Sequence, residues 1–165
     1  MSADPGLRAL TGRLIRSLRR DRLVQATTDE LLHHLSSDRV LLYFFYRQWE
    51  GQVTFESLSD PQYSILGSTG PDDCFGDRYA EDYLAGRVRA IADVETEPIA
   101  ECHRTFLLDL QVRANLVVPV LTERGLWGLL VAHHCCEPRL WSAEHIAAMQ
   151  RGAKNLAAAP SVALS

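Results

Sequence analysis

The chain has 165 residues and a mass of 18.5 kDa, with 47% hydrophobic and 23% charged residues, which is the composition of one ordinary globular domain. Its 17 Lys and Arg against 21 Asp and Glu leave a formal net charge of −4, which gives no general attraction to nucleic acid or to an anionic membrane. No apolar run approaches the ~18 residues of a transmembrane helix, and the N-terminus lacks the pattern of a signal peptide, so we expect a cytoplasmic protein.

The first half of the chain is predicted to contain helical structure followed by two strands. Leucines recur at spacings of three and four over residues 7–35, with a polar break at 26–30, and this indicates helix. Residues 38–49 are apolar and aromatic and predict a buried strand, and 51–59 predict its antiparallel neighbour. Residues 60–86 lack periodicity and are dense in Gly, Pro, Asp and Ser, which is typical of a functional irregular segment.

The second half of the chain is predicted to complete an antiparallel sheet. Residues 87–94 predict a third strand and 98–111 a short helix. Residues 112–135 predict a hairpin whose two apolar runs meet at Thr122–Gly125, where glycine suits a positive φ. Ser142 is the expected cap of a closing helix over 143–158. The predicted fold class is therefore α+β, with a central antiparallel sheet, terminal helices on one face and the irregular middle segment on the other.

A cluster of His133, His134, Cys135 and Cys136 suggests a metal site at first sight. On a strand, however, successive side chains point to opposite faces, so His133 and Cys135 share one side and the other two share the opposite side. Four ligands then cannot converge on one ion, and we expect no metal.

Two further cysteines raise the question of nucleophilic chemistry. Cys102 lies beside His103, but adjacent helical residues diverge by ~100°, so the pair does not form a nucleophile and its base. Residue types alone favour a core cysteine at this position. Cys74 lies in the polar stretch GSTGPDDCFGDRY, residues 67–79, which is an unusual place for a cysteine that fills core volume.

Four ordered segments together resemble one family. They are DDCFG (72–76), GRVRAIADV (86–94), ECHRTFLLDLQVRANLVVPV (101–120) and LWGLLVAHHCCEPRLW (126–141). This series is similar to the GAF domain of a cyanobacteriochrome, a phytochrome-related photoreceptor that binds a linear tetrapyrrole, or bilin. The stretch from Asp72 to Phe75 resembles the Asp-X-Cys-Phe (DXCF) motif of one subgroup. The resemblance spans residues 7–158 and divides the chain into an N-terminal linker helix (1–22), a bilin-binding GAF domain (23–158) and a C-terminal tail (159–165).

The resemblance assigns the covalent chemistry to two cysteines. Cys102 resembles the cysteine that forms a permanent thioether to ring A of the bilin, and Cys74 resembles a second cysteine that adds reversibly to the central methine bridge. A bond from Cys74 divides the conjugated path into two short halves, so absorption moves to the violet or blue. The implied function is light-driven switching between this doubly linked state and a longer-wavelength, teal to orange state. The implied cofactor is phycocyanobilin or phycoviolobilin, and no turnover is expected beyond autocatalytic attachment of the pigment.

The resemblance also implies three polar contacts to the pigment. Asp72 matches the motif aspartate near the pyrrole nitrogens, where a carboxylate is a strong acceptor for N–H groups that are costly to bury unpaired. His103 resembles the histidine that packs on and hydrogen-bonds to the tetrapyrrole. His133 resembles the strand histidine that faces ring D.

Three more residues are expected at the pigment. Phe75 belongs to the motif itself. Tyr83 is expected either to contact the bilin or to pack beneath the loop. Arg87 is expected either to pair with a propionate or to lie on the surface.

Several alternatives remain open at this level. The expected partners are the output domains of a longer receptor, reached through the terminal helices, and a homodimer is also compatible with such helices.

One alternative function is that of a free methionine sulfoxide reductase on the same fold, which would cycle Cys74 or Cys102 through a disulfide. Another is a GAF module that binds a small ligand without covalent attachment. Pigment that survives denaturation would separate the photoreceptor from both.

Overall fold

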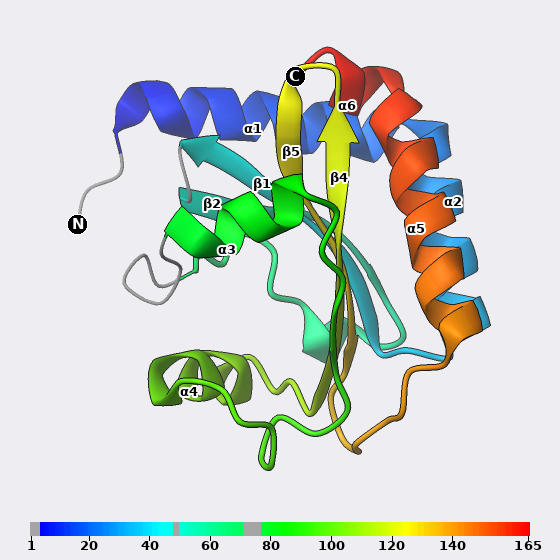
Figure 1. Cartoon of the computed structure of the whole chain (residues 1–165). Coiled ribbons are helices and arrows are strands. Elements are labelled where there is room, and N and C mark those ends of the chain that lie inside the picture. Colours follow the sequence, from blue (N-terminus) through cyan, green and yellow to red (C-terminus); the bar gives the residue numbers. More distant parts are fainter. Residues whose placement is uncertain (1–3, 48–49, 71–76) are drawn as a thin grey trace.

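A five-stranded antiparallel sheet forms the centre of the protein (Figure 1). The computed structural model describes residues 4–47, 50–70 and 77–165. The strand order is β2-β1-β5-β4-β3, and every neighbouring pair is antiparallel. The strands are β1 (Arg39–Arg47), β2 (Glu50–Leu58), β3 (Arg89–Ile91), β4 (Ala114–Thr122) and β5 (Gly125–His134).

Helices cover both faces of the sheet, and Figure 1 shows α2 and α5 together on one side and α3 and α4 on the other. The helices are α1 (Pro5–Arg20), α2 (Arg22–Leu35), α3 (Asp77–Leu84), α4 (Glu101–Asp109), α5 (Ala143–Ala158) and α6 (Pro160–Ala163), with a 3₁₀ turn at Pro61–Tyr63. No helix in the described ranges is both long and apolar enough to cross a bilayer. The predicted α+β fold is confirmed.

Strand alternation divides the core into two parts. On one face, Leu42, Leu116 and Leu130 are fully buried with residues of the terminal helices in the largest apolar cluster. On the other face, Leu41, Val117 and Val131 pack in a second, smaller cluster with Tyr83 of α3. Because side chains alternate along a strand, one apolar sequence supplies both layers.

The predicted hairpin and the last helix agree closely with the structure. β4 and β5 meet at a turn in which Gly125 has a φ of 112°, as the sequence predicts. Ser142 caps α5 by accepting a hydrogen bond from the N–H of His145 at 3.1 Å. A second glycine, Gly128, is required by close packing, since a Cβ there would lie 2.1 Å from the carbonyl oxygen of Tyr43 on β1.

The break in the N-terminal helical region is at Asp21 and not at the predicted residues 26–30. The Asp21 carboxylate accepts from the N–H of Leu23 at 3.0 Å and so caps α2. It also accepts from the hydroxyl of Ser161 at 2.6 Å. Partial burial is the largest single influence on the pKa of Asp21 and raises it. The hydrogen bonds that its carboxylate accepts together outweigh burial, so the net effect is a lowered pKa. Asp21 therefore marks the junction of the two helices, since its backbone N–H bonds to the carbonyl oxygen of Leu18 at the end of α1 and its side chain caps the start of α2.

Two segments expected to be irregular contain helices. The segment 60–86 includes α3, whose Tyr83 is buried at 4% exposure. The segment 159–165, expected to form a tail, includes α6, where Val162 is fully buried in the main core. Both helices are short and depend on packing against the sheet or α1, so local periodicity is a weak signal for them.

Candidate bilin-binding pocket

A pocket lies between the sheet and helices α3 and α4, with about 840 Å³ of empty space, part of it open to solvent. Strands β1, β2, β4 and β5 supply most of its wall, and Tyr83 and Phe106 add aromatic rings from the two helices. The few polar side chains in its lining include Arg89, His103, Asn115 and His133. A mostly apolar cleft with a few placed polar groups is typical of a site for an extended organic ligand.

Helix α4 separates the two adjacent residues that the sequence singled out. Cys102 is exposed, whereas His103 is 6% exposed and lines the pocket. This divergence follows from the ~100° step between neighbouring helical positions. Burial first, and then the positive charge of Arg89, lower the pKa of His103 to about 4. His103 is therefore neutral near pH 7 and presents an uncharged imidazole to the pocket.

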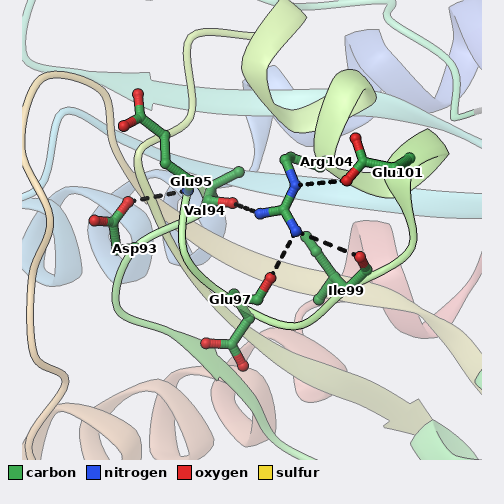
Figure 2. Close-up of polar contacts among 7 residues, drawn as sticks. All are labelled: Asp93, Val94, Glu95, Glu97, Ile99, Glu101 and Arg104. Atoms are coloured by element: carbon green, nitrogen blue, oxygen red, sulfur yellow. Dashed lines mark hydrogen bonds and ion pairs between the residues drawn. The ribbon is translucent and has the colours of Figure 1, made fainter.

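Arg104, the next residue, anchors the segment that precedes α4. Its guanidinium donates to the backbone carbonyls of Val94, Glu97 (2.8 Å) and Ile99 (3.5 Å). It also pairs with the Glu101 carboxylate at 3.3 Å, and Figure 2 shows it at the centre of this loop. These charge-assisted hydrogen bonds hold the loop and the first turn of α4 together, and so they position Cys102 and His103.

The strand histidines lie on opposite faces of β5, as alternation predicts. His133 is 4% exposed and lines the pocket, and its Nδ1 lies 3.0 Å from Nη1 of the buried Arg39. Burial and the Arg39 charge hold the pKa of His133 well below its usual value. His134 instead accepts from Arg139 at 2.6 Å and packs edge-on against Trp141. Within the described ranges, no group of three or more His, Cys, Asp or Glu side chains is placed to hold a metal ion.

The structure places the remaining candidates differently from one another. Tyr83 lines the pocket, and it also packs in the smaller apolar cluster on the pocket face of the sheet. Arg87 is absent from the lining and its Nη1 pairs with the Asp82 carboxylate at 2.9 Å, whereas Arg89, two residues on, does line the pocket. Asp72, Cys74 and Phe75 lie outside the described residues.

The paired cysteines at the end of β5 do not share the pocket. Cys135 and Cys136 are free thiols. Burial raises the pKa of Cys135 to about 11, so this thiol is protonated and unreactive near neutral pH. The Cys136 sulfur lies 3.3 Å from the Tyr63 hydroxyl, and this contact raises the pKa of Tyr63 to about 12.

Sequence reasoning missed two polar residues that lie beside His133, namely Arg39 and Asn115. Arg39 is fully buried, although it is a charged residue at the start of the apolar strand β1. Asn115 is 3% exposed and interrupts the otherwise apolar run of β4. Both residues could have been found from the sequence, because each is a polar residue within a segment predicted to be a buried strand. A buried polar group needs a hydrogen-bond partner, so such a position indicates a polar contact or a ligand.

A model of the GAF domain family matches residues 19–159, which is most of the chain. The chain belongs to the GAF domain family. The GAF domain described here is 47% identical over 154 residues to an uncharacterized protein of Picosynechococcus sp., covering 93% of this chain and 94% of that protein. It is also 41% identical over 99 residues to the circadian input-output histidine kinase CikA of Synechocystis sp., covering 58% of this chain but only 13% of the kinase.

Solved structures of GAF domains from photoreceptors share this architecture. The blue-light absorbing form of the PixJ GAF domain of Thermosynechococcus elongatus superimposes with a TM-score of 0.73 at 33% identity, over 83% of this chain and 84% of that one. The phycocyanobilin-bound GAF domain of a cyanobacterial phytochrome gives a TM-score of 0.73 at 30% identity, over 95% of this chain and 93% of that one. The GAF domain described here is therefore structurally similar to bilin-binding domains of cyanobacteriochromes and phytochromes.

Proposed function

We propose that this GAF domain is photosensory and carries a linear tetrapyrrole, phycocyanobilin or phycoviolobilin, bound covalently through Cys102. The observation that carries the proposal is the pocket, in which apolar walls surround two buried, neutral histidines, His103 and His133. A bilin is long and largely apolar, with a few polar N–H and C=O groups, so it matches such a lining. Cys102 lies one residue before the pocket-lining His103, on the helix that Arg104 anchors.

The similar solved structures support the same ligand class. One of them contains phycocyanobilin, and another is described as a blue-light absorbing form. The finer proposal is that this chain belongs to the Asp-X-Cys-Phe subgroup and that Cys74 adds reversibly to the central methine bridge. Its neighbours Asp72 and Asp73 are negatively charged, and nearby negative charge disfavours a permanent thiolate. A sulfur that is ionised only part of the time suits a bond that must form and break.

Two variants test the roles of the cysteines. The chain is produced in cells that make phycocyanobilin, and the purified protein is denatured and examined for zinc-dependent fluorescence of attached pigment. Cys102→Ala is expected to abolish the attached pigment, whereas Cys136→Ala, which alters an exposed thiol elsewhere, is expected to keep it. Cys74→Ala is expected to keep the pigment but to lose the violet or blue band.

Two results contradict this proposal. Colourless wild-type protein would remove the photosensory function and favour a reductase or a module for a non-covalent ligand. A Cys74→Ala variant that retains the blue band would remove the two-cysteine mechanism alone.

We further propose that the domain works in the cytoplasm as the sensory part of a longer receptor. The similarity to 13% of a histidine kinase supports this arrangement, in which a GAF domain accompanies output domains. Helices α1 and α5–α6 are the proposed connections and the proposed surface for a homodimer.

A further inference from the structure

The solvent side of helix α1 carries only positive charge. The helix contains no Asp or Glu, and five arginines lie along it: Arg8, Arg13, Arg16, Arg19 and Arg20. Because successive helical residues are ~100° apart, these five fall within an arc of about 140°. The buried residues of the helix, Thr11, Leu14 and Leu18, lie on the opposite side. Figure 1 shows α1 at an outer edge of the molecule, so the arginines are open to a partner.

These arginines are not neutralised within the protein. All five are exposed, as is Arg22 at the start of α2, and together the six form an arginine stripe. Across residues 4–47, 50–70 and 77–165, no ion pair joins any of the six to a carboxylate. The acidic residues that flank α1 are engaged elsewhere, because Asp4 pairs with Arg47 at 3.6 Å and Asp21 accepts from Ser161 at 2.6 Å. A chain of net charge −4 thus has one strongly positive surface.

Exposed apolar side chains lie at the margin of the arginine stripe. A groove between α1 and α6 is lined by Arg13, Arg20 and Arg22 together with Leu10 and Leu164. Leu10 is 45% exposed and Leu164 is 79% exposed. Cations beside exposed leucines are typical of a surface that binds where lipid headgroups meet acyl chains.

We propose that the arginine stripe binds the surface of an anionic phospholipid membrane, with Leu10 and Leu164 entering the headgroup layer. Each arginine near such a surface is attracted by the lipid charge, and its guanidinium matches the geometry of a phosphate. The apolar side of α1 is packed against the protein, so the helix adsorbs to the membrane and does not insert. This inference goes beyond the proposed photosensory function and does not depend on the pigment.

The composition of the surface favours a membrane over other anionic partners. Nucleic acid presents phosphates along its backbone but no apolar layer for Leu10 and Leu164. Protein interfaces are enriched in aromatic residues, and α1 contains none. A second copy that met the same stripe would bring like charges together, so a homodimer would use other residues of the terminal helices.

Co-sedimentation of the 165-residue chain with lipid vesicles tests the proposal. The wild type is expected to bind vesicles of phosphatidylcholine mixed with phosphatidylglycerol, and to bind phosphatidylcholine alone much more weakly. Binding is expected to fall as salt rises from about 0.1 M to about 1 M, because screening shortens the reach of the charges from about 10 Å to about 3 Å. Equal binding to both kinds of vesicle, or binding that salt leaves unchanged, would overturn the proposal without the need for any variant.

Two double variants of equal net charge locate the surface. Arg16→Gln combined with Arg19→Gln removes two charges from the stripe and is expected to lower the partition coefficient about 25-fold, or about fivefold for each arginine. Arg151→Gln combined with Lys154→Gln removes two exposed charges from α5 and is expected to bind as the wild type does. Equal losses in the two double variants would mean that only net charge matters, and the assignment to α1 would be wrong.

A leucine pair and two other polyanions separate a membrane from the alternatives. Leu164→Ser is expected to weaken vesicle binding about fivefold, whereas Leu140→Ser, at an 85% exposed leucine before α5, is expected to have no effect. The same chain is titrated with duplex DNA and with polyglutamate at matched charge concentration. Tighter binding to either polymer than to anionic vesicles would overturn the proposal and assign the stripe to nucleic acid or to an acidic protein.

Discussion

Acid should destabilise the pigment-free protein through its buried pocket histidines. His103 has a pKa of about 4 in the folded chain, because of burial and then the Arg89 charge, against about 6.5 for an unperturbed histidine. Between these two values the unfolded chain binds a proton that the folded chain does not. The free energy of unfolding therefore falls as pH falls through this window, by up to about 1.4 kcal/mol per pH unit for one such histidine.

Integrated from pH 7 to pH 5.5, this difference amounts to about 1 kcal/mol for His103. Its 6% exposure means that solvent screening reduces the value little. His133 acts in the same direction, since burial and Arg39 also lower its pKa. The substitution His103→Gln removes one of these contributions and leaves the other in place.

Urea unfolding followed by circular dichroism at pH 7 and pH 5.5 measures the effect. Wild type is expected to lose about 1 kcal/mol more than His103→Gln over this interval. His33→Gln, the same change on the exposed surface of α2, is the matched control and is expected to lose as much as the wild type. If His103→Gln also loses as much as the wild type, then His103 is not held neutral by its surroundings and the reasoning about the pocket is wrong.

Three further stability predictions can be checked by thermal unfolding. Arg104→Met removes the hydrogen bonds that anchor the loop before α4 and is expected to cost about 2 kcal/mol, or about 4–8 °C in Tm; an unchanged Tm would mean that the loop is held by other contacts. Gly128→Ala is expected to cost about 1–3 kcal/mol because its Cβ would lie 2.1 Å from the Tyr43 carbonyl oxygen, and a neutral effect would contradict this close approach. Gly12→Ala, in α1 with its nearest neighbour 3.5 Å away, should instead stabilise by about 0.5–1 kcal/mol, so a loss would indicate packing at this helix position.

Sequence patterns were sufficient to predict those elements that are stabilised by residues close together in the chain. The hairpin with its turn at Gly125 and the helix capped by Ser142 depend on residues close together in the chain. Alternation along β5 likewise places His133 and His134 on opposite faces, and the helical step separates Cys102 from His103. These parts of the fold and of the candidate site could therefore be predicted from the chain itself.

Periodicity failed where the stabilising partner is distant in sequence. Helix α6 is held by the burial of Val162 and by the hydrogen bond between Ser161 and Asp21, 140 residues earlier. The same Asp21 ends the first helix at a position that the leucine pattern does not mark. Helix α3 is short and packs Tyr83 against the sheet, so its sequence alone carries little helical signal.

The sequence by itself determined the order of the elements, the two faces of the sheet and the residues that resemble a bilin site, because these follow from local propensity, alternation and motif. Only the tertiary structure decided that Arg39, His133 and Asn115 share one row, since strand register joins Arg39 to His133 across 94 positions and Asn115 to His133 across 18. It also decided that Arg89, and not Arg87, lines the pocket. The physical reason is that hydrogen-bond pairing and burial depend on which strands become neighbours, and no local pattern specifies that.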